Sequence, residues 1–226
     1  MDTKFILDKA GFPMIWVDKP LSAYIHWLPI TKIQFEVFMC DSPSSDFGDT
    51  WYRELLELNP RVSPKAITKK NYWKSLLTGI KPSEAENYAN WCAGDEDEWL
   101  LPSLEDWNFA YKTLKQLPPL KDPFKDITFD GDAKLTGRVE LLLGKFDAIV
   151  ESLHKEKYTL ADQMLMRYGV MEWVQHESRG QQEWAGMGQP ITGLQSILRT
   201  PESAPQTPKN STSDRFHYYG FRLIKR

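Results

Sequence analysis

Residues 99–111, which read WLLPSLEDWNFAY, place a helix directly after a short apolar run, and this junction restricts the possible folds more than any other stretch. Pro102 disfavours a helical backbone in the residue before it, so the apolar run ends there. Ser103 and Asp106 have the spacing of a capping box, in which each side chain accepts a hydrogen bond from the other residue's backbone N–H. Trp107 falls on the apolar face of the predicted helix. The chain is therefore expected to combine short extended segments with amphipathic helices.

Other segments repeat this alternation. Residues 14–30 contain short apolar runs interrupted by two prolines, which is typical of strands that end in turns. We predict helices after the cap Thr31, over residues 50–58, and after a capping box of Ser83 with Glu86, and a closing strand within residues 215–226. Helices interleaved with short strands and long loops indicate an α+β fold rather than a parallel sheet.

Residues 135–154 carry apolar side chains at helical spacing, among them Leu142 and Phe146, and they follow a proline-rich connector. The spacing predicts a long amphipathic helix. Its broad apolar stripe favours packing on the domain's own core, and the alternative is a surface that binds a partner.

Charge and composition disfavour several classes of protein. The chain has 28 basic and 31 acidic residues and a net charge of -3, so it has no general attraction to nucleic acid. No apolar run is long enough to span a bilayer, and the first residues lack the pattern of a signal peptide, so we expect a cytoplasmic protein without membrane association. Cys40 and Cys92 are predicted to be core residues. The four histidines lack the spacing of metal ligands.

Three blocks of sequence, taken together, resemble the formylglycine-generating enzyme family, whose sulfatase-modifying-factor domain has a C-type-lectin-like fold. The blocks are WLPITKIQFEVFM, IKPSEAENYANWCAGDEDEWLLPSLEDWNFAY, and YGVMEWV with the later YYGFRLI. The matching positions are Ala85, Tyr88, Trp91, Leu101, Pro102, Trp107, Val170, Glu172, Trp173, Gly220, Phe221 and Arg222. The resemblance implies one domain over residues 1–226, with short strands, a few helices and long loops, and an inserted amphipathic helix within a lineage-specific segment at about 112–166.

The resemblance assigns framework roles, rather than chemical ones, to most of these residues. The framework residues are Trp91, Pro102, Trp107, Glu172, Trp173, Gly220, Phe221 and Arg222. Large aromatic side chains would fill the junctions between helices and sheet. Gly220 is expected to allow a backbone shape that a side chain would block.

The copper site of the family has no counterpart in this sequence. Formylglycine-generating members hold copper with two cysteines shortly before the GFR motif, because copper(I) prefers thiolate ligands. The corresponding segment here contains no cysteine, so we expect no cofactor, no catalytic residue and no enzyme activity. A related branch binds iron through clustered histidines, and the scattered histidines of this chain do not resemble that arrangement.

The sequence offers three weaker candidates for a chemical site. Glu172 is a weak calcium candidate, because the family's other oxygen ligands in this block are missing. An acid–base site of a different kind would need the convergence of Glu172, His176, Glu177 and Glu183. The alternative to an inactive member is an active metal-dependent oxidase or oxygenase of the family with an unrecognised site.

The resemblance favours a protein-binding accessory or regulatory subunit, since domains of this family occur as non-catalytic parts of bacterial multi-protein systems, including defence systems. The expected partner is a protein, not nucleic acid or a membrane. The candidate contact residues are Leu142, Phe146, Trp184, Arg215, Phe216, His217 and Tyr218. For Trp184 the alternative is a structural role, in which its side chain pins a loop to the core. The alternative binding function is ligand display by a diversity-generating retroelement, because polar and aromatic residues precede the GFR motif.

Overall fold

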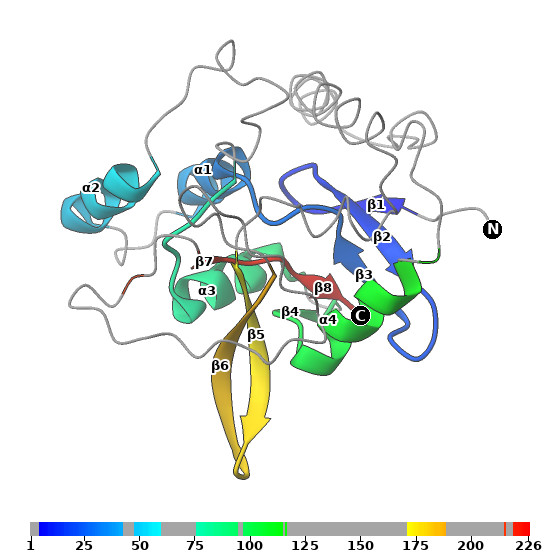
Figure 1. Cartoon of the computed structure of the whole chain (residues 1–226). Helices are drawn as coiled ribbons and strands as arrows, with labels where there is room; N and C mark the ends of the chain where they lie inside the picture. Colours follow the sequence, from blue (N-terminus) through cyan, green and yellow to red (C-terminus); the bar gives the residue numbers. More distant parts are fainter. Residues whose placement is uncertain are drawn as a thin grey trace.

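The computed structural model describes residues 5–42, 48–59, 76–94, 97–114, 116, 171–188, 215 and 219–226 (Figure 1). Within these ranges the chain forms a mixed α+β fold, as the sequence predicts. The predicted helix at 135–154 and nearly all of the segment at about 112–166 lie outside the described residues. In the part of the chain that is described, no helix has the length and apolar character needed to cross a membrane.

The larger sheet joins strands from both ends of the chain. Its strands, in spatial order, are β1 (Phe5–Leu7), β2 (Pro13–Val17), β3 (Ala23–His26), β8 (Ile224–Lys225) and β4 (Trp99–Leu100). All neighbours in this sheet are antiparallel. The late strand β8 therefore lies between an early strand and a central one, and the sheet requires segments that are far apart in sequence.

The described residues also form four helices: α1 (Lys32–Asp41), α2 (Asp49–Leu58), α3 (Pro82–Cys92) and α4 (Leu104–Leu114). The capping box predicted for α4 is confirmed, because the Asp106 N–H donates to Ser103 Oγ at 3.0 Å and the Ser103 N–H donates to Asp106 Oδ2 at 3.1 Å. Thr31 caps α1 as predicted, with Gln34 returning the hydrogen bond.

The start of α3 differs from the prediction. The helix begins at Pro82, and the Glu84 carboxylate accepts the Lys81 N–H at 2.8 Å. Ser83 is thus an exposed residue inside the first turn rather than the cap. Proline is favoured at the first helical position, where its missing N–H costs nothing, and this preference sets the boundary.

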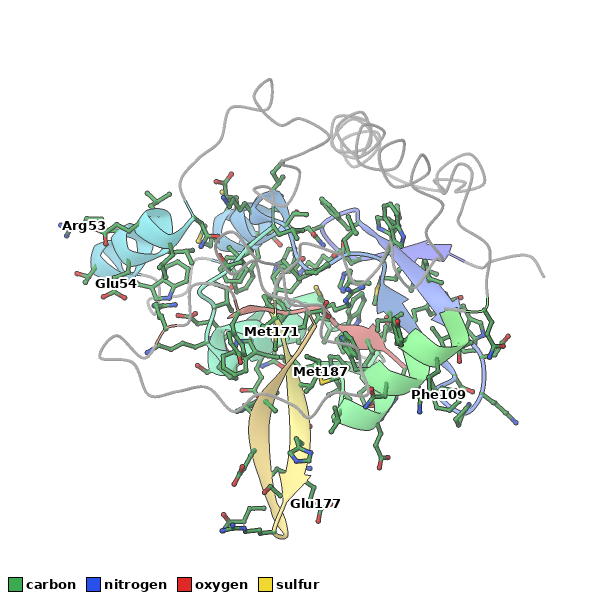
Figure 2. The ribbon with its side chains drawn as sticks, viewed as in Figure 1. Arg53, Glu54, Phe109, Met171, Glu177 and Met187 are labelled. Atoms are coloured by element: carbon green, nitrogen blue, oxygen red, sulfur yellow. The ribbon has the colours of Figure 1, made fainter. Side chains whose placement is uncertain are left out.

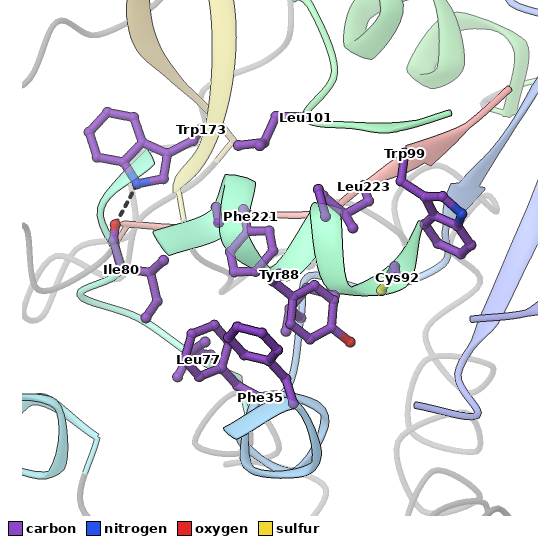
Figure 3. Packing of buried hydrophobic residues seen from close by; sticks show 14 of the residues in the cluster. Phe35, Leu77, Ile80, Tyr88, Cys92, Trp99, Leu101, Trp173, Phe221 and Leu223 are labelled. Carbon is purple, nitrogen blue, oxygen red and sulfur yellow. Dashed lines mark hydrogen bonds between the residues drawn. The ribbon is translucent and has the colours of Figure 1, made fainter. Parts of the chain in front are cut away.

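The larger sheet is buried on both faces. Along β2, Ile15 and Val17 join an apolar cluster that includes Trp107 of α4. Met14 points the opposite way and joins a second cluster, which contains Tyr88 and Phe221 (Figure 3). The alternation follows the two-residue period of a strand. Helix α4 therefore covers one face, while α1 and α3 cover the other.

A second, smaller sheet contains β5 (Met171–Ser178), β6 (Gln181–Gly188) and β7 (Tyr219–Gly220), in the order β6-β5-β7. Strands β5 and β6 form a hairpin that projects from the rest of the described structure (Figure 1). Its turn is Arg179 and Gly180, with φ values of 53° and 76°. Two successive positive φ values are characteristic of a tight hairpin turn whose twist matches that of the strands.

Two expectations about single residues are wrong. Cys40 is exposed at the end of α1, whereas Cys92 is buried as predicted. Gly220 lies in β7 opposite Glu172, and the described glycines with positive φ are others: Gly11, Gly79, Gly180 and Gly188. Gly220 is buried, and its φ does not lie in the left-handed region.

Candidate functional site

Three residues of the predicted framework meet in one buried network. Arg222 donates to Glu172 through both forks of its guanidinium, Nε to Oε2 at 2.6 Å and Nη2 to Oε1 at 2.7 Å. Trp107 Nε1 donates to Glu172 Oε2 at 3.0 Å. The third nitrogen of Arg222 donates to the backbone carbonyl oxygens of His26 and Trp27 at 3.1 and 2.9 Å. The network ties β5 and α4 to the C-terminal segment.

The hydrogen bonds of this network limit the chemical roles that are open to Glu172. Its side chain is completely buried, and both carboxylate oxygens accept charge-assisted or indole hydrogen bonds. A calcium ion at this position would lie against the guanidinium of Arg222, which repels it. The geometry fits a framework carboxylate whose partners are the side chains of Arg222 and Trp107.

The remaining framework residues also serve packing. Trp173 Nε1 donates to the carbonyl oxygen of Ile80 at 2.6 Å (Figure 3), and Phe221 packs on Tyr88 with 5.6 Å between ring centroids. The carbonyl of Pro102 accepts the Gln175 N–H at 3.1 Å.

Trp91 is the framework residue nearest the surface. It is half-buried, and its Nε1 donates to Asp41 Oδ2 at 2.8 Å. The ammonium of Lys9 lies 4.6 Å from the centroid of the Trp91 ring. Trp91 therefore joins α3 to the end of α1 and to the turn after β1.

A second buried polar cluster centres on Asp8, a residue that no sequence motif singles out. Asp8 Oδ1 accepts the Phe12 N–H at 2.7 Å. Asp8 Oδ2 lies within hydrogen-bonding distance of His26 Nε2 at 2.9 Å, Gln34 Nε2 at 3.0 Å and the Tyr88 hydroxyl at 3.3 Å. His26 Nδ1 accepts the backbone N–H of Leu223, so the ring proton belongs on Nε2 and is donated to Asp8.

Tyr88 and Cys92, which lie near Asp8, are held in their neutral forms. Burial raises the pKa of Tyr88 well above its usual value, and the negative charge of Asp8 raises it further. Burial, again followed by the charge of Asp8, raises the pKa of the Cys92 thiol. A thiol held neutral in this way is a poor nucleophile and a poor metal ligand. The cluster therefore fits a structural role that links β1, β3, α1 and α3.

Arg215, predicted as a partner contact, is instead buried, and its guanidinium binds acidic residues of α2 and α3. Its guanidinium donates to Glu84 Oε1 at 2.6 Å and Oε2 at 2.9 Å, and to the carbonyl oxygen of Gly79 at 2.7 Å. A further bond of 3.3 Å reaches Glu54 of α2. Trp51 also donates to Glu84. Burial by itself lowers the pKa of Arg215, but the hydrogen bonds and charges of Glu84 and Glu54 raise it overall.

The four candidate residues for acid–base chemistry do not converge on one site. His176 and Glu183 are direct partners across the hairpin, while Glu177 pairs with Gln182 and points to the opposite face. Glu172 lies at the buried end of the same strand. Among the described residues there is no group of three or more histidine, cysteine or acidic side chains arranged to hold a metal ion.

The outer half of the hairpin is largely exposed, and we call residues 175–184 the hairpin tip. Met171 and Met187 lie where the hairpin joins the body, whereas Glu177 lies near its far end (Figure 2). Glu177, Gln181, Gln182 and Glu183 are exposed, and Trp184 is half-buried. Trp184 was predicted as a contact residue or a loop pin; it occupies a strand and packs against the second apolar cluster.

The signal for this hairpin is present in the sequence. Two mostly apolar runs, at 171–174 and 184–188, flank a polar stretch with an Arg-Gly pair near its centre, and a dipeptide ending in glycine between two extended runs is typical of a hairpin turn. The backbone edge that the hairpin exposes depends on register, which no residue type encodes by itself. The other predicted contact residues, Leu142, Phe146, Phe216, His217 and Tyr218, lie outside the described residues.

Comparison with known proteins identifies no relative: no family model, no curated protein and no solved structure matches the chain. The class of the protein therefore rests on its own architecture, which is a mixed α+β fold with an antiparallel sheet, few helices and a projecting hairpin.

Proposed function

We propose that this chain is a non-catalytic member of the formylglycine-generating enzyme family that acts as a protein-binding accessory or regulatory subunit. The observation that carries the proposal is the hairpin tip, which projects from the rest of the described structure (Figure 1) and exposes polar residues such as Glu177, Gln182 and Glu183. Loops and hairpins fixed on a rigid scaffold are common recognition elements. A bacterial multi-protein system, such as a defence or regulatory assembly, is the proposed setting.

The proposed C-type-lectin-like architecture is supported by two features. The strands are short and the sheet joins the two ends of the described chain, so long connections must run between them. The residues that match the family's motifs are also those that hold the interior together, as in the contacts of Glu172 with Arg222 and Trp107. A family can keep such packing residues while its chemistry is lost.

The first test is affinity capture of the tagged chain from a lysate of its host, followed by size-exclusion chromatography and mass spectrometry. We expect a protein that stays bound in a fixed ratio. A Leu142→Asp, Phe146→Asp double variant, checked for folding by circular dichroism, tests whether the segment at 135–154 makes the contact.

The metal content of the purified chain is measured in the same experiment. Copper or iron retained in a one-to-one ratio, with oxygen consumption when a thiol substrate is added, would contradict a non-catalytic role. That result would favour the alternative of an active oxidase or oxygenase.

A further inference from the structure

The register of the hairpin determines which backbone groups face outward along β6. Ser178 and Gln181 flank a two-residue turn, so they exchange both hydrogen bonds, and the pattern alternates from there. Gln181 and Glu183 therefore direct their N–H and C=O groups inward to β5. Gln182 and Trp184 direct theirs away from the hairpin. The same alternation turns the Gln175 N–H outward on β5, where it donates to the Pro102 carbonyl.

The outer edge of β6 lacks the bulge, proline and lysine that often protect an edge strand, and its one charged residue is Glu183. Its pairing with β5 is continuous over the whole hairpin, with no bulge. Residues 181–188 include no proline and no lysine. Within the described part of the chain, no segment pairs with the backbone of Gln182 or Trp184. The inner half of β6 is buried, which limits the open edge to residues 181–184.

The side chains along this edge define the chemistry of an added strand. Glu183 lies on one face of the hairpin together with His176, while Gln182 and Trp184 lie on the other. Opposite charges attract across neighbouring strands, and aromatic side chains pair well with β-branched or aromatic ones. An added strand would thus present a basic residue beside Glu183 and an apolar residue beside Trp184.

We propose that residues 181–184 form a docking edge for an extended segment of a partner protein in which lysine or arginine alternates with apolar residues. The segment adds a strand to β6 by hydrogen bonds to the outward backbone groups of Gln182 and Trp184. This mode of recognition takes affinity from the main chain and specificity from alternate side chains.

A second copy of this chain is a poorer occupant of the same edge. Antiparallel self-pairing that used the outward groups of Gln182 and Trp184 on both copies would place Glu183 directly opposite its own counterpart. Like charges in that position destabilise a pair of strands. Charge complementarity therefore favours a basic segment from another protein.

The test uses a short fluorescein-labelled peptide of alternating lysine and valine, titrated with the full chain and followed by fluorescence anisotropy. Two control peptides are matched to it: one carries glutamate in place of lysine, and one carries N-methyl groups on the backbone nitrogens that would pair with β6. We expect the unmodified lysine peptide to bind roughly tenfold more tightly than either control.

Variants of the chain separate the backbone contribution from the charge. Gln182→Pro removes an outward N–H without removing a hydrogen bond of the hairpin, and we expect it to weaken binding roughly tenfold. Gln182→Thr keeps that N–H and is the matched control. Glu183→Lys should reverse the preference, so that the glutamate peptide binds more tightly than the lysine peptide. The reversal keeps the test valid even if Gln182→Pro perturbs the hairpin.

Absence of peptide binding, equal binding of all three peptides, or equal binding by the Gln182→Pro and Gln182→Thr variants would each overturn the docking edge. A dimer that dissociates only in Gln182→Pro would also overturn it, since a second copy would then occupy the edge. The docking edge rests on the proposed protein-binding function, but the edge can be wrong while that function is right. If a host partner copurifies equally with Gln182→Pro and the unaltered chain, the function stands and its contact surface lies elsewhere.

Discussion

The Glu172 carboxylate has no solvent around it, and its charge is balanced by the guanidinium of Arg222 and the indole N–H of Trp107. Removing one member of a buried ion pair leaves the other charge without compensation, and this costs about 3–5 kcal/mol. We expect Glu172→Gln to lower the free energy of unfolding by an amount in that range, measured by urea denaturation.

The matched control is Arg226→Met. Arg226 pairs with Asp106 at 3.0 Å, but 44% of its side chain is exposed. Water screens such a pair, so its loss should cost no more than about 1 kcal/mol. Equal losses of unfolding free energy in the two variants would mean that the buried pair of Glu172 and Arg222 stabilises the protein no more than the exposed pair does.

The two cysteines should differ in reactivity because their surroundings differ. Cys40 is exposed, whereas burial and the nearby charge of Asp8 raise the pKa of the Cys92 thiol. A raised thiol pKa keeps the group protonated, and hence unreactive, at a mildly alkaline pH. We expect iodoacetamide at about pH 8 to alkylate Cys40 in the native protein and Cys92 only in denaturant, as read by mass spectrometry after proteolysis. Alkylation of Cys92 at the rate of Cys40 would show that the Asp8 cluster opens readily.

Two serines near helix starts allow the capping of α3 and α4 to be compared. Ser103 accepts the Asp106 N–H and caps α4, while Ser83 lies exposed within the first turn of α3. Loss of a capping side chain costs about 1 kcal/mol. We therefore expect Ser103→Ala to lower the free energy of unfolding by about that amount and Ser83→Ala to change it by only a few tenths of a kcal/mol. A larger effect at Ser83 would favour the helix boundary predicted from the sequence over the one described.

Helices and strands whose boundaries depend on local chemistry were predictable from the sequence. Thr31 and Ser103 cap helices because their hydroxyls reach a nearby N–H, and this needs no tertiary contact. The start of α3 was misplaced because two local signals compete there, and Pro82 with Glu84 prevails over Ser83 with Glu86. Cys40 was misplaced because a dense apolar run does not reveal which side of a short helix faces the core.

The polar networks were beyond prediction for a different reason. Asp8, His26 and Tyr88 come from three separate segments, and only the fold brings them to one point. Arg215 looks like a surface residue in its polar sequence context. In the structure it is buried, and the Glu84 carboxylate balances its positive charge. The likeness to family motifs did select Glu172 and Arg222, but it gave no information that they bind each other.

Both ends of the described chain contribute to one cooperative unit. Strand β8 lies between β3 and β4, and the segment just before it provides Arg222 for the buried ion pair and the Leu223 N–H for His26. The apolar side chains of Leu223 and Ile224 belong to opposite faces of the larger sheet. Early strands therefore gain their full set of partners only when the last segment is in place.

Deletion of residues 223–226 tests this dependence across the whole molecule. It removes β8 from the middle of the sheet and the burial of Leu223 and Ile224, and each such side chain contributes about 1.5–3 kcal/mol. A domain with about 5–15 kcal/mol of stability does not tolerate that loss together with the hydrogen bonds of a central strand. We expect the truncated chain to lose its near-ultraviolet circular dichroism and its cooperative urea transition. Removal of Arg226 alone, which lies just beyond β8, should leave both, because the paired strand and both apolar side chains remain.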